Sequence, residues 1–164
     1  MPFFKQFNEV NVLLRKNRVQ KLLDLNSGLK DHDLILTPKN VEEILVSRDR
    51  ALKNQGRVEL DTKVIREIIK RLSESSYITQ NNFLSCINDV YETFHFIKNE
   101  TSDFISDEDI LAAVMVYFEK VCHGSVELLM GKGVEKIVEN VKNQKGLAEI
   151  EKSEEEEEYW NFDK

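Results

Sequence analysis

Nine consecutive apolar residues, from Ile110 to Phe118, constrain the fold of this chain more than any other stretch. Ser106 and the three acidic residues after it precede the run, and a side-chain oxygen followed by carboxylates is typical of a helix start. On the helical period the run is apolar in every direction, which indicates a helix buried on all sides. Nine residues are too few to cross a bilayer core, which requires about 20. We therefore predict a soluble domain, without membrane contact, whose central helix covers residues 107–122.

The length of the chain and its cysteines indicate one cytoplasmic domain. Its 164 residues, 41% of them apolar, are enough for a single core. Cys86 and Cys122 fall within predicted helices, where a free thiol behaves as a small apolar side chain, so a reducing compartment is expected. The stretch from Met1 to Phe7 lacks the basic segment and apolar core of a signal peptide. These features together predict a cytoplasmic protein.

The formal net charge of −7 is concentrated at one end of the chain. Residues 151–164 hold seven acidic and two basic side chains, a local charge of −5 that leaves about −2 for the rest. A nearly neutral body counts against nucleic-acid binding, because neutralising phosphates requires a concentrated basic surface. The densest basic run, Arg15-Lys16-Asn17-Arg18 with Lys21, is interpreted as the solvated face of a first helix.

Local start and stop signals divide the chain into five or six helices. The clearest start is Thr37-Pro38, an N-cap followed by proline at the first helical position. The longest predicted helix, residues 79–100, repeats apolar side chains at alternating spacings of four and three, a seam that we expect to pack on the helix at 107–122. The other predicted helices cover residues 10–25, 38–54, 62–73 and 125–141. We predict an all-α, bundle-like single domain over residues 1–145.

After this domain the composition changes to that of an acidic tail. Residues 146–164 include five consecutive glutamates, which repel one another, so this tail is predicted to be disordered. It ends in an aromatic cluster of Tyr159, Trp160 and Phe162, side-chain types that often anchor binding interfaces. One interpretation is that this cluster docks on another protein or on a second copy of the chain. The alternative is that the segment folds back onto its own domain or hangs free.

Two basic residues interrupt apolar stripes. Arg48 and Lys98 project among apolar side chains of their helices, and a buried charge requires a partner. The candidate partners are Glu59 and Glu100, with Arg57 nearby in sequence. One interpretation is structural, either ion pairs or long side chains that carry their charges to the surface. The alternative is a polar pocket between helices, with or without enzymatic chemistry, in which Arg48 and Lys98 hold a small anion.

Phe96 departs from the seam of its own helix. It projects about 140° away from Phe83 on a period of 3.6 residues, so the seam does not bury it. Either a second layer of the domain covers this ring or a partner does. We include Phe96 with the tail aromatics as a candidate interaction residue.

The residue patterns indicate no catalysis, metal site or cofactor. Glu92 and His95 are three residues apart, the spacing by which di-iron bundles present ligands, but such a site requires the motif twice and two further glutamates. We interpret His95 as a side chain at the edge of the seam. The sequence contains no phosphate loop, dinucleotide fingerprint, nucleophile elbow or zinc-ligand spacing.

Several segments taken together resemble a known family. They are Leu36-Thr37-Pro38, Gly56-Arg57-Val58-Glu59, Ser76-Tyr77-Ile78-Thr79-Gln80, Ile97-Lys98-Asn99-Glu100-Thr101 and Ile105-Ser106-Asp107. Over roughly residues 34 to 130 the chain resembles a domain-of-unknown-function family of small all-helical proteins from Gram-positive anaerobic bacteria. It departs from that pattern at Ser75-Ser76-Tyr77, where the family tends to have Ser-Pro-Tyr, and at His95, where an aromatic residue is expected. The resemblance implies no activity, cofactor or partner.

The sequence therefore predicts a cytoplasmic binding or interaction protein, with a protein partner or self-association and without catalytic chemistry. The alternative is a small-molecule or anion-binding helical domain with a pocket around Arg48 and Lys98. These patterns leave the oligomeric state and the identity of any ligand open.

Overall fold

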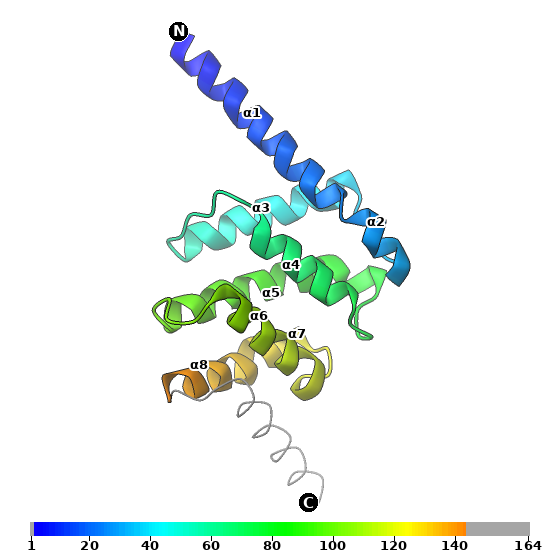
Figure 1. Cartoon of the computed structure of the whole chain (residues 1–164), viewed down its shortest axis with the longest axis vertical. Coiled ribbons are helices and arrows are strands. Elements are labelled where there is room, and N and C mark those ends of the chain that lie inside the picture. The colour runs from blue at the N-terminus through cyan, green and yellow to red at the C-terminus, as the bar shows by residue number, and fades with distance from the viewer. Residues whose placement is uncertain (1, 144–164) are drawn as a thin grey trace, which may run out of the picture.

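The computed structural model describes the backbone of residues 2–143 and the side chains of residues 9–143. All regular elements in this part of the chain are helical and share one hydrophobic core, which confirms the predicted all-α single domain (Figure 1). The α-helices are α1 (Pro2–Leu23), α2 (Asn26–Leu29), α3 (Pro38–Asn54), α4 (Lys63–Ser73), α5 (Gln80–Glu100), α6 (Asp107–Val116), α7 (Val126–Leu128) and α8 (Val134–Lys142). A 3₁₀ turn (Lys30–His32) follows α2, and π-helical turns (Tyr117–Val121 and Leu129–Gly133) follow α6 and α7. The predicted acidic tail, residues 146–164, lies outside the described residues.

Side-chain caps place helix starts where the sequence predicts them. At α3 the Thr37 hydroxyl accepts from the Asn40 amide and the Asn40 side chain accepts from the Thr37 amide, each at 3.1 Å. At α6 the Ser106 hydroxyl accepts from the backbone N–H of Asp109 at 3.1 Å, in a first turn that carries three acidic residues. These caps are local in sequence, so the residue types alone predict them.

Helix α5 lies at the centre of the body and contacts α3, α4, α6 and α8 (Figure 1). The residues of its predicted seam are all fully buried: Phe83, Ile87, Val90, Phe94 and Ile97. Helix α6 packs on α5, but Ala112, Met115 and Val116 of α6 are only partly buried. The prediction that α6 is the central helix, buried on all sides, was therefore wrong. An apolar sequence does not distinguish a helix enclosed by neighbours from one that keeps a partly uncovered side.

A close approach holds the connection after α6 against the connection between α4 and α5. Gly124 has a φ of 81°, the left-handed region that favours glycine. A Cβ at this position would lie 2.4 Å from the Cβ of Tyr77, so the contact requires glycine. The chain then runs from α7 through its π-helical turn into α8, and α8 packs alongside α5.

Residues 34–36 form an extended segment ahead of α3 that is held by two side-chain amides. The Asn26 side chain donates to the carbonyl of Leu36 and accepts from its N–H, each at 2.8 Å. Gln80 makes the same pair of hydrogen bonds with Ile35, each at 2.9 Å. These backbone groups have no helical partner, and the two amides satisfy them.

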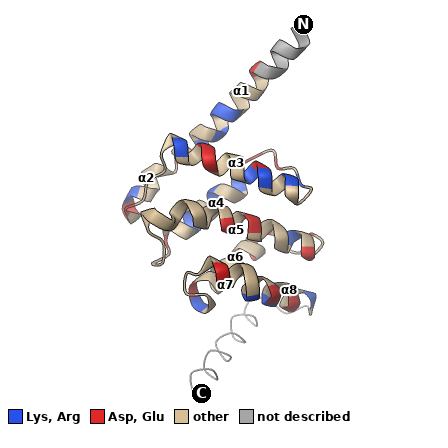
Figure 2. Ribbon diagram, turned by 180° about the vertical axis from the view of Figure 1, so that it is seen from behind, with Lys and Arg blue, Asp and Glu red and all other residues tan. Residues whose placement is uncertain are grey.

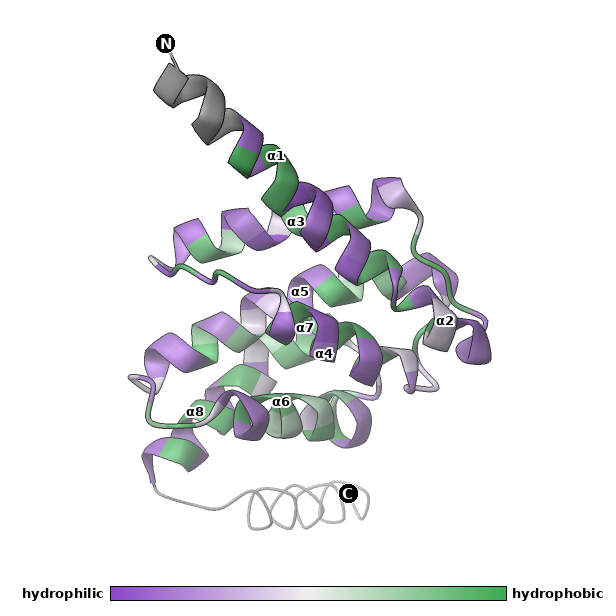
Figure 3. Cartoon of the chain, turned by 45° about the horizontal axis from the view of Figure 1, so that its top comes forward, coloured by the Kyte–Doolittle hydropathy of each residue, from purple (hydrophilic) through white to green (hydrophobic). Residues whose placement is uncertain are grey.

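Helix α1 leaves the body beside α3, and most of its length projects away from the other helices (Figure 1, Figure 2, Figure 3). Its last turns are anchored: Leu22 is fully buried, and the Arg18 guanidinium donates to the carbonyl of Leu60 at 3.1 Å. Earlier in the helix Val10 and Leu14 are exposed. Among the helices that the structure describes, none combines the length and the hydropathy needed to cross a bilayer.

Candidate functional site

Arg48 of α3 is buried and directs its guanidinium at the connector between α3 and α4. Its Nη2 donates to the carbonyl oxygens of Glu59 and Asp61, at 2.9 and 2.7 Å. Its Nη1 donates to the Asp49 carboxylate at 3.1 Å, and only 2% of the residue is exposed. A planar guanidinium with several donors can hold an irregular backbone segment in this way. Arg48 therefore positions the connector that carries Glu59.

The Glu59 carboxylate meets side chains from both α3 and α5. The Tyr91 hydroxyl donates to its Oε2 at 2.7 Å, and Arg48 Nη2 lies 3.7 Å from the same oxygen. His95 Nε2 lies 2.9 Å from Oε1, which is ion-pair distance, although neither ring nitrogen of His95 makes a hydrogen bond with good angular geometry. The imidazole also packs edge-on against Tyr91 and Phe94. We call Arg48, Glu59, Tyr91 and His95 the buried polar cluster.

The surroundings of the cluster shift the pKa of two of its members. Burial opposes the ionisation of Glu59, but the close approach of the His95 ring, the hydrogen bond from Tyr91 and the charge of Arg48 outweigh burial and lower the pKa of Glu59. Burial, followed by the hydrogen bond to Glu59 and the charge of that carboxylate, raises the pKa of Tyr91. At neutral pH the cluster therefore contains an ionised carboxylate and a neutral phenol.

The sequence indicated that His95 lies at the edge of the seam, but the structure places its side chain inside the core. His95 is 1% exposed, and its Nε2 lies 2.9 Å from the carboxylate of Glu59 on the connector. Glu92, in contrast, is exposed. Glu92 and His95, which have the spacing of a di-iron motif, therefore do not share a site. Within residues 9–143 the structure contains no group of three or more potential metal ligands placed to hold an ion.

The remaining predicted ligand-binding residues lie around the end of α5 and have other partners. Lys98 Nζ is 2.8 Å from the Asp107 carboxylate at the start of α6, and Glu100 is exposed. Arg57 donates to the Asp103 carboxylate on the loop between α5 and α6. Of the predicted set, the structure thus brings Arg48 and Glu59 together and places Lys98 and Arg57 in separate ion pairs.

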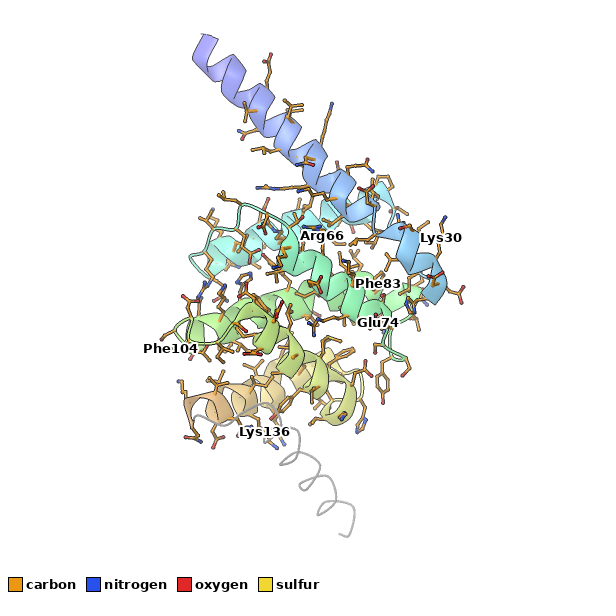
Figure 4. All side chains as sticks on the ribbon, in the orientation of Figure 1. Lys30, Arg66, Glu74, Phe83, Phe104 and Lys136 are labelled. Carbon is orange, nitrogen blue, oxygen red and sulfur yellow. The ribbon has the colours of Figure 1, made fainter. Side chains whose placement is uncertain are left out.

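An open groove between α5 and α8 has an apolar floor. One part, of about 440 Å³, is lined by Phe96 of α5 and by Val134 and Val138 of α8. An adjoining part, of about 450 Å³, is lined by Val141 of α8 and by Phe104, which extends from the loop after α5 (Figure 4). Phe96 is 41% exposed and Phe104 is 90% exposed, so two large apolar rings are open to solvent along the same groove. We call the two parts together the α5/α8 groove.

The rim of the α5/α8 groove is mainly acidic. Glu100 of α5 and Glu135 and Glu139 of α8 line it, and Lys142 is the one basic residue among the described residues that do so. In Figure 2 the ribbons of both α5 and α8 contain acidic residues, coloured red. Helix α8 is the second layer expected over Phe96, but it leaves the ring partly uncovered.

Sequence reasoning missed members of both sites. Tyr91 and His95 are four residues apart and therefore share a helix face, so a polar pair beside the apolar seam was a usable signal. Phe104 and Val138 carried no such signal, because their place in the groove depends on how α8 packs on α5. The predicted interaction residues of the tail, Tyr159, Trp160 and Phe162, lie outside the described residues.

Comparison with known proteins adds a family but no activity. Residues 21–147 match the model described as Family of unknown function (DUF6323). The match extends on both sides of the resemblance predicted from the sequence and includes the buried polar cluster and the groove. The part of α1 before residue 21 lies outside it. No curated protein and no solved structure matches the chain.

Proposed function

This chain belongs to that family of unknown function, and we propose that it is a cytoplasmic interaction protein whose α5/α8 groove binds a basic amphipathic helix. The observation that carries the proposal is the exposure of Phe96 on a helix whose seam is fully buried. Contiguous apolar surface bordered by charged residues is typical of a binding site.

The form of the groove favours a helical ligand. Two packed helices, α5 and α8, form its walls, and a third helix can place apolar side chains at spacings of three and four along such a floor. Glu100, Glu135 and Glu139 at the rim attract basic side chains that flank the apolar stripe of the ligand. A helix with a basic polar face therefore suits this groove better than an acidic one.

The alternative function, an anion-binding pocket at Arg48 and Lys98, has less support from the geometry. Both terminal nitrogens of the Arg48 guanidinium donate to protein oxygens, and Lys98 pairs with Asp107 while its Nζ lies 5.8 Å from the centre of the Phe94 ring. An anion would have to displace these partners. We therefore propose a binding role without a catalytic residue.

We also propose two further properties that the sequence suggests and that are independent of the groove. One is an origin in a Gram-positive anaerobic bacterium. The other is that the aromatic cluster of the tail (Tyr159, Trp160 and Phe162) provides a further contact with a partner.

A labelled synthetic peptide tests the proposed function. Its helix carries leucines on one face and lysines on the other, and its binding to the full chain is followed by fluorescence anisotropy. We expect saturable binding that Phe96→Ser weakens roughly 30-fold, the loss typical of a central apolar contact. The variant leaves the charge of the rim unchanged, so a loss of affinity reports the ring itself.

Val46→Ser is the matched control, since Val46 is also an exposed apolar residue of a helix but lies on α3. It should leave the dissociation constant within about twofold, as expected for a surface substitution away from the site. A peptide with glutamates in place of lysines should not bind. Equal binding by the Phe96→Ser and Val46→Ser chains would show non-specific charge attraction and contradict the proposal.

A further inference from the structure

We infer that the helix bound by the α5/α8 groove is α1 of a second copy of this chain. The inference rests on the proposed function, because it names the partner of the same groove. Among the long helices in residues 2–143, α1 is the one that projects from the body (Figure 1). It is therefore a helical ligand that the chain itself supplies.

The projecting part of α1 carries an apolar stripe. Val10, Leu13 and Leu14 fall within an arc of about 100° on a period of 3.6 residues, and they are 54%, 65% and 48% exposed. In the sequence, Phe3 and Phe7 precede Val10 and Leu14 at spacings of four, three and four, the repeat by which helices pack on one another. Helix α1 thus has the apolar pattern that the floor of the groove requires.

The charges of the two surfaces are opposite. Arg15 and Lys16 are exposed and project about 100° and 60° beyond the two edges of the stripe of α1, and the exposed Glu9 lies about 40° beyond one edge. Glu100, Glu135 and Glu139 line the groove. Residues 2–16 hold three basic and one acidic side chain, so docking α1 on the groove would bring a net basic helix segment to an acidic rim, which favours this pairing and speeds the encounter.

The two surfaces also agree in length. At a rise of about 1.5 Å per residue, the sequence stretch from position 3 to position 14 spans about 16 Å of helix. The lining residues of α8, from Val134 to Lys142, span about 12 Å, and Phe104 extends the floor beyond them. One projecting helix is enough to cover the exposed rings of the groove.

Other segments of the same chain are unsuited to the groove. Helix α1 leaves the body beside α3, and α8 lies at the opposite end of the molecule (Figure 1, Figure 2), so a chain cannot place its own α1 there. Residues 151–164 carry seven acidic side chains, which the acidic rim repels. The occupant must then be α1 of another copy, in a contact that joins two different surfaces.

Sedimentation of the full chain tests this inference. The mean mass of the wild type should rise with concentration beyond that of two copies, since every bound copy still offers a free helix or a free groove. Leu14→Ser removes a contact from α1 and Phe96→Ser removes one from the groove, so each variant alone should stay monomeric at concentrations where the wild type associates. Val12→Ser is the matched control, because Val12 is 52% exposed on the other side of α1. It should associate as the wild type does.

Mixing the two deficient variants gives the decisive result. The Leu14→Ser chain keeps an intact groove and the Phe96→Ser chain keeps an intact α1, so an equimolar mixture should form complexes of two copies and stop there. Self-association of the Phe96→Ser chain alone would show that α1 helices pair with each other, and would overturn the inference. A mixture that stays monomeric would overturn it as well.

The peptide experiment separates failure of this inference from failure of the proposed function. If the wild type is monomeric while its groove binds the leucine and lysine peptide in a Phe96-dependent manner, the groove serves a different protein and only the inference fails. If the groove binds neither α1 nor the peptide, both fail. Circular dichroism of each variant confirms that the substitutions, all at exposed positions, leave the helices folded.

Discussion

Two neighbouring residues of α5, His95 and Phe96, have opposite surroundings. His95 is 1% exposed and contacts Glu59, Tyr91 and Phe94. Phe96 is 41% exposed and lines an open groove. The polar ring is inside the molecule and the apolar ring is partly outside, which reverses the usual distribution of these residue types.

The buried His95 and the exposed Phe96 differ in whether other residues of the chain contact the unusual side chain and offset the cost of its position. On the His95 side, the Glu59 carboxylate lies at ion-pair distance and the Tyr91 ring packs edge-on against the imidazole, so the burial of His95 is a matter of stability. On the Phe96 side, the described part of the chain covers the ring only in part. Function is therefore to be sought on the groove side of α5, and the buried polar cluster is expected to govern stability.

The largest expected effect distinguishes two phenylalanines of the same helix. Phe94→Ser should lower the free energy of unfolding by about 4 kcal/mol, or unfold the domain, because it leaves a cavity and buries a hydroxyl. Phe96→Ser should change it by less than about 0.5 kcal/mol, since that ring is already in contact with water. Urea unfolding followed by circular dichroism measures both. Similar losses in the two variants would show that Phe96 belongs to the core and would remove the contrast.

A smaller effect distinguishes two glutamates on the two sides of α5. Glu59→Gln should lower the free energy of unfolding by about 2 kcal/mol, because it removes the carboxylate that faces the buried Arg48 and accepts from Tyr91. Glu100→Gln at the groove should leave stability unchanged and weaken binding of the lysine-bearing peptide. The same urea titration compares them. Equal stability of the two variants would mean that the buried polar cluster contributes nothing to the fold.

The smallest expected effect concerns the charge of Glu59 alone. The folded state lowers the pKa of Glu59 below its ordinary value of 4.5, so its stabilisation is complete above that pH and is lost as the pH falls through the lower, folded-state value. The stability difference between the wild type and Glu59→Gln should therefore shrink on acidification below about pH 4.5. Urea midpoints of both chains between neutral and acid pH measure this difference. A difference that stays constant would show that the hydrogen bonds matter and the charge does not.

Helix positions were predictable because their signals are local. The Thr37-Pro38 cap, the Ser106 cap and the seam of α5 each depend on residues within a few turns of one another. The outward projection of Phe96 was also predictable from a local signal, the angle between Phe96 and the seam on the helical period. Whether neighbouring helices enclose a given helix depends on tertiary packing and not on its own residues. For this reason α6 was wrongly predicted to be the central helix.

The buried polar cluster was harder to predict because its members are distant in sequence. Tyr91 and Glu59 are 32 residues apart, and Glu59 lies on an irregular connector whose path has no periodic signal. Lys98 illustrates the same limit. Glu100, two residues further along the helix, points to a different side, and the partner is Asp107, which the loop between α5 and α6 brings back to Lys98.

The amides of Asn26 and Gln80 have a consequence beyond the local hydrogen bonds of the segment ahead of α3. An extended backbone with unpaired N–H and carbonyl groups is a template on which a strand of another chain can add, and this is a route to aggregation. Successive residues of an extended segment direct these groups to opposite sides. Gln80 takes those of Ile35, and Asn26 takes those of Leu36. The backbone groups of Ile35 and Leu36 are thereby closed to β-pairing on both sides of this strand-like stretch. A strand of another chain therefore cannot add to the molecule at these two residues.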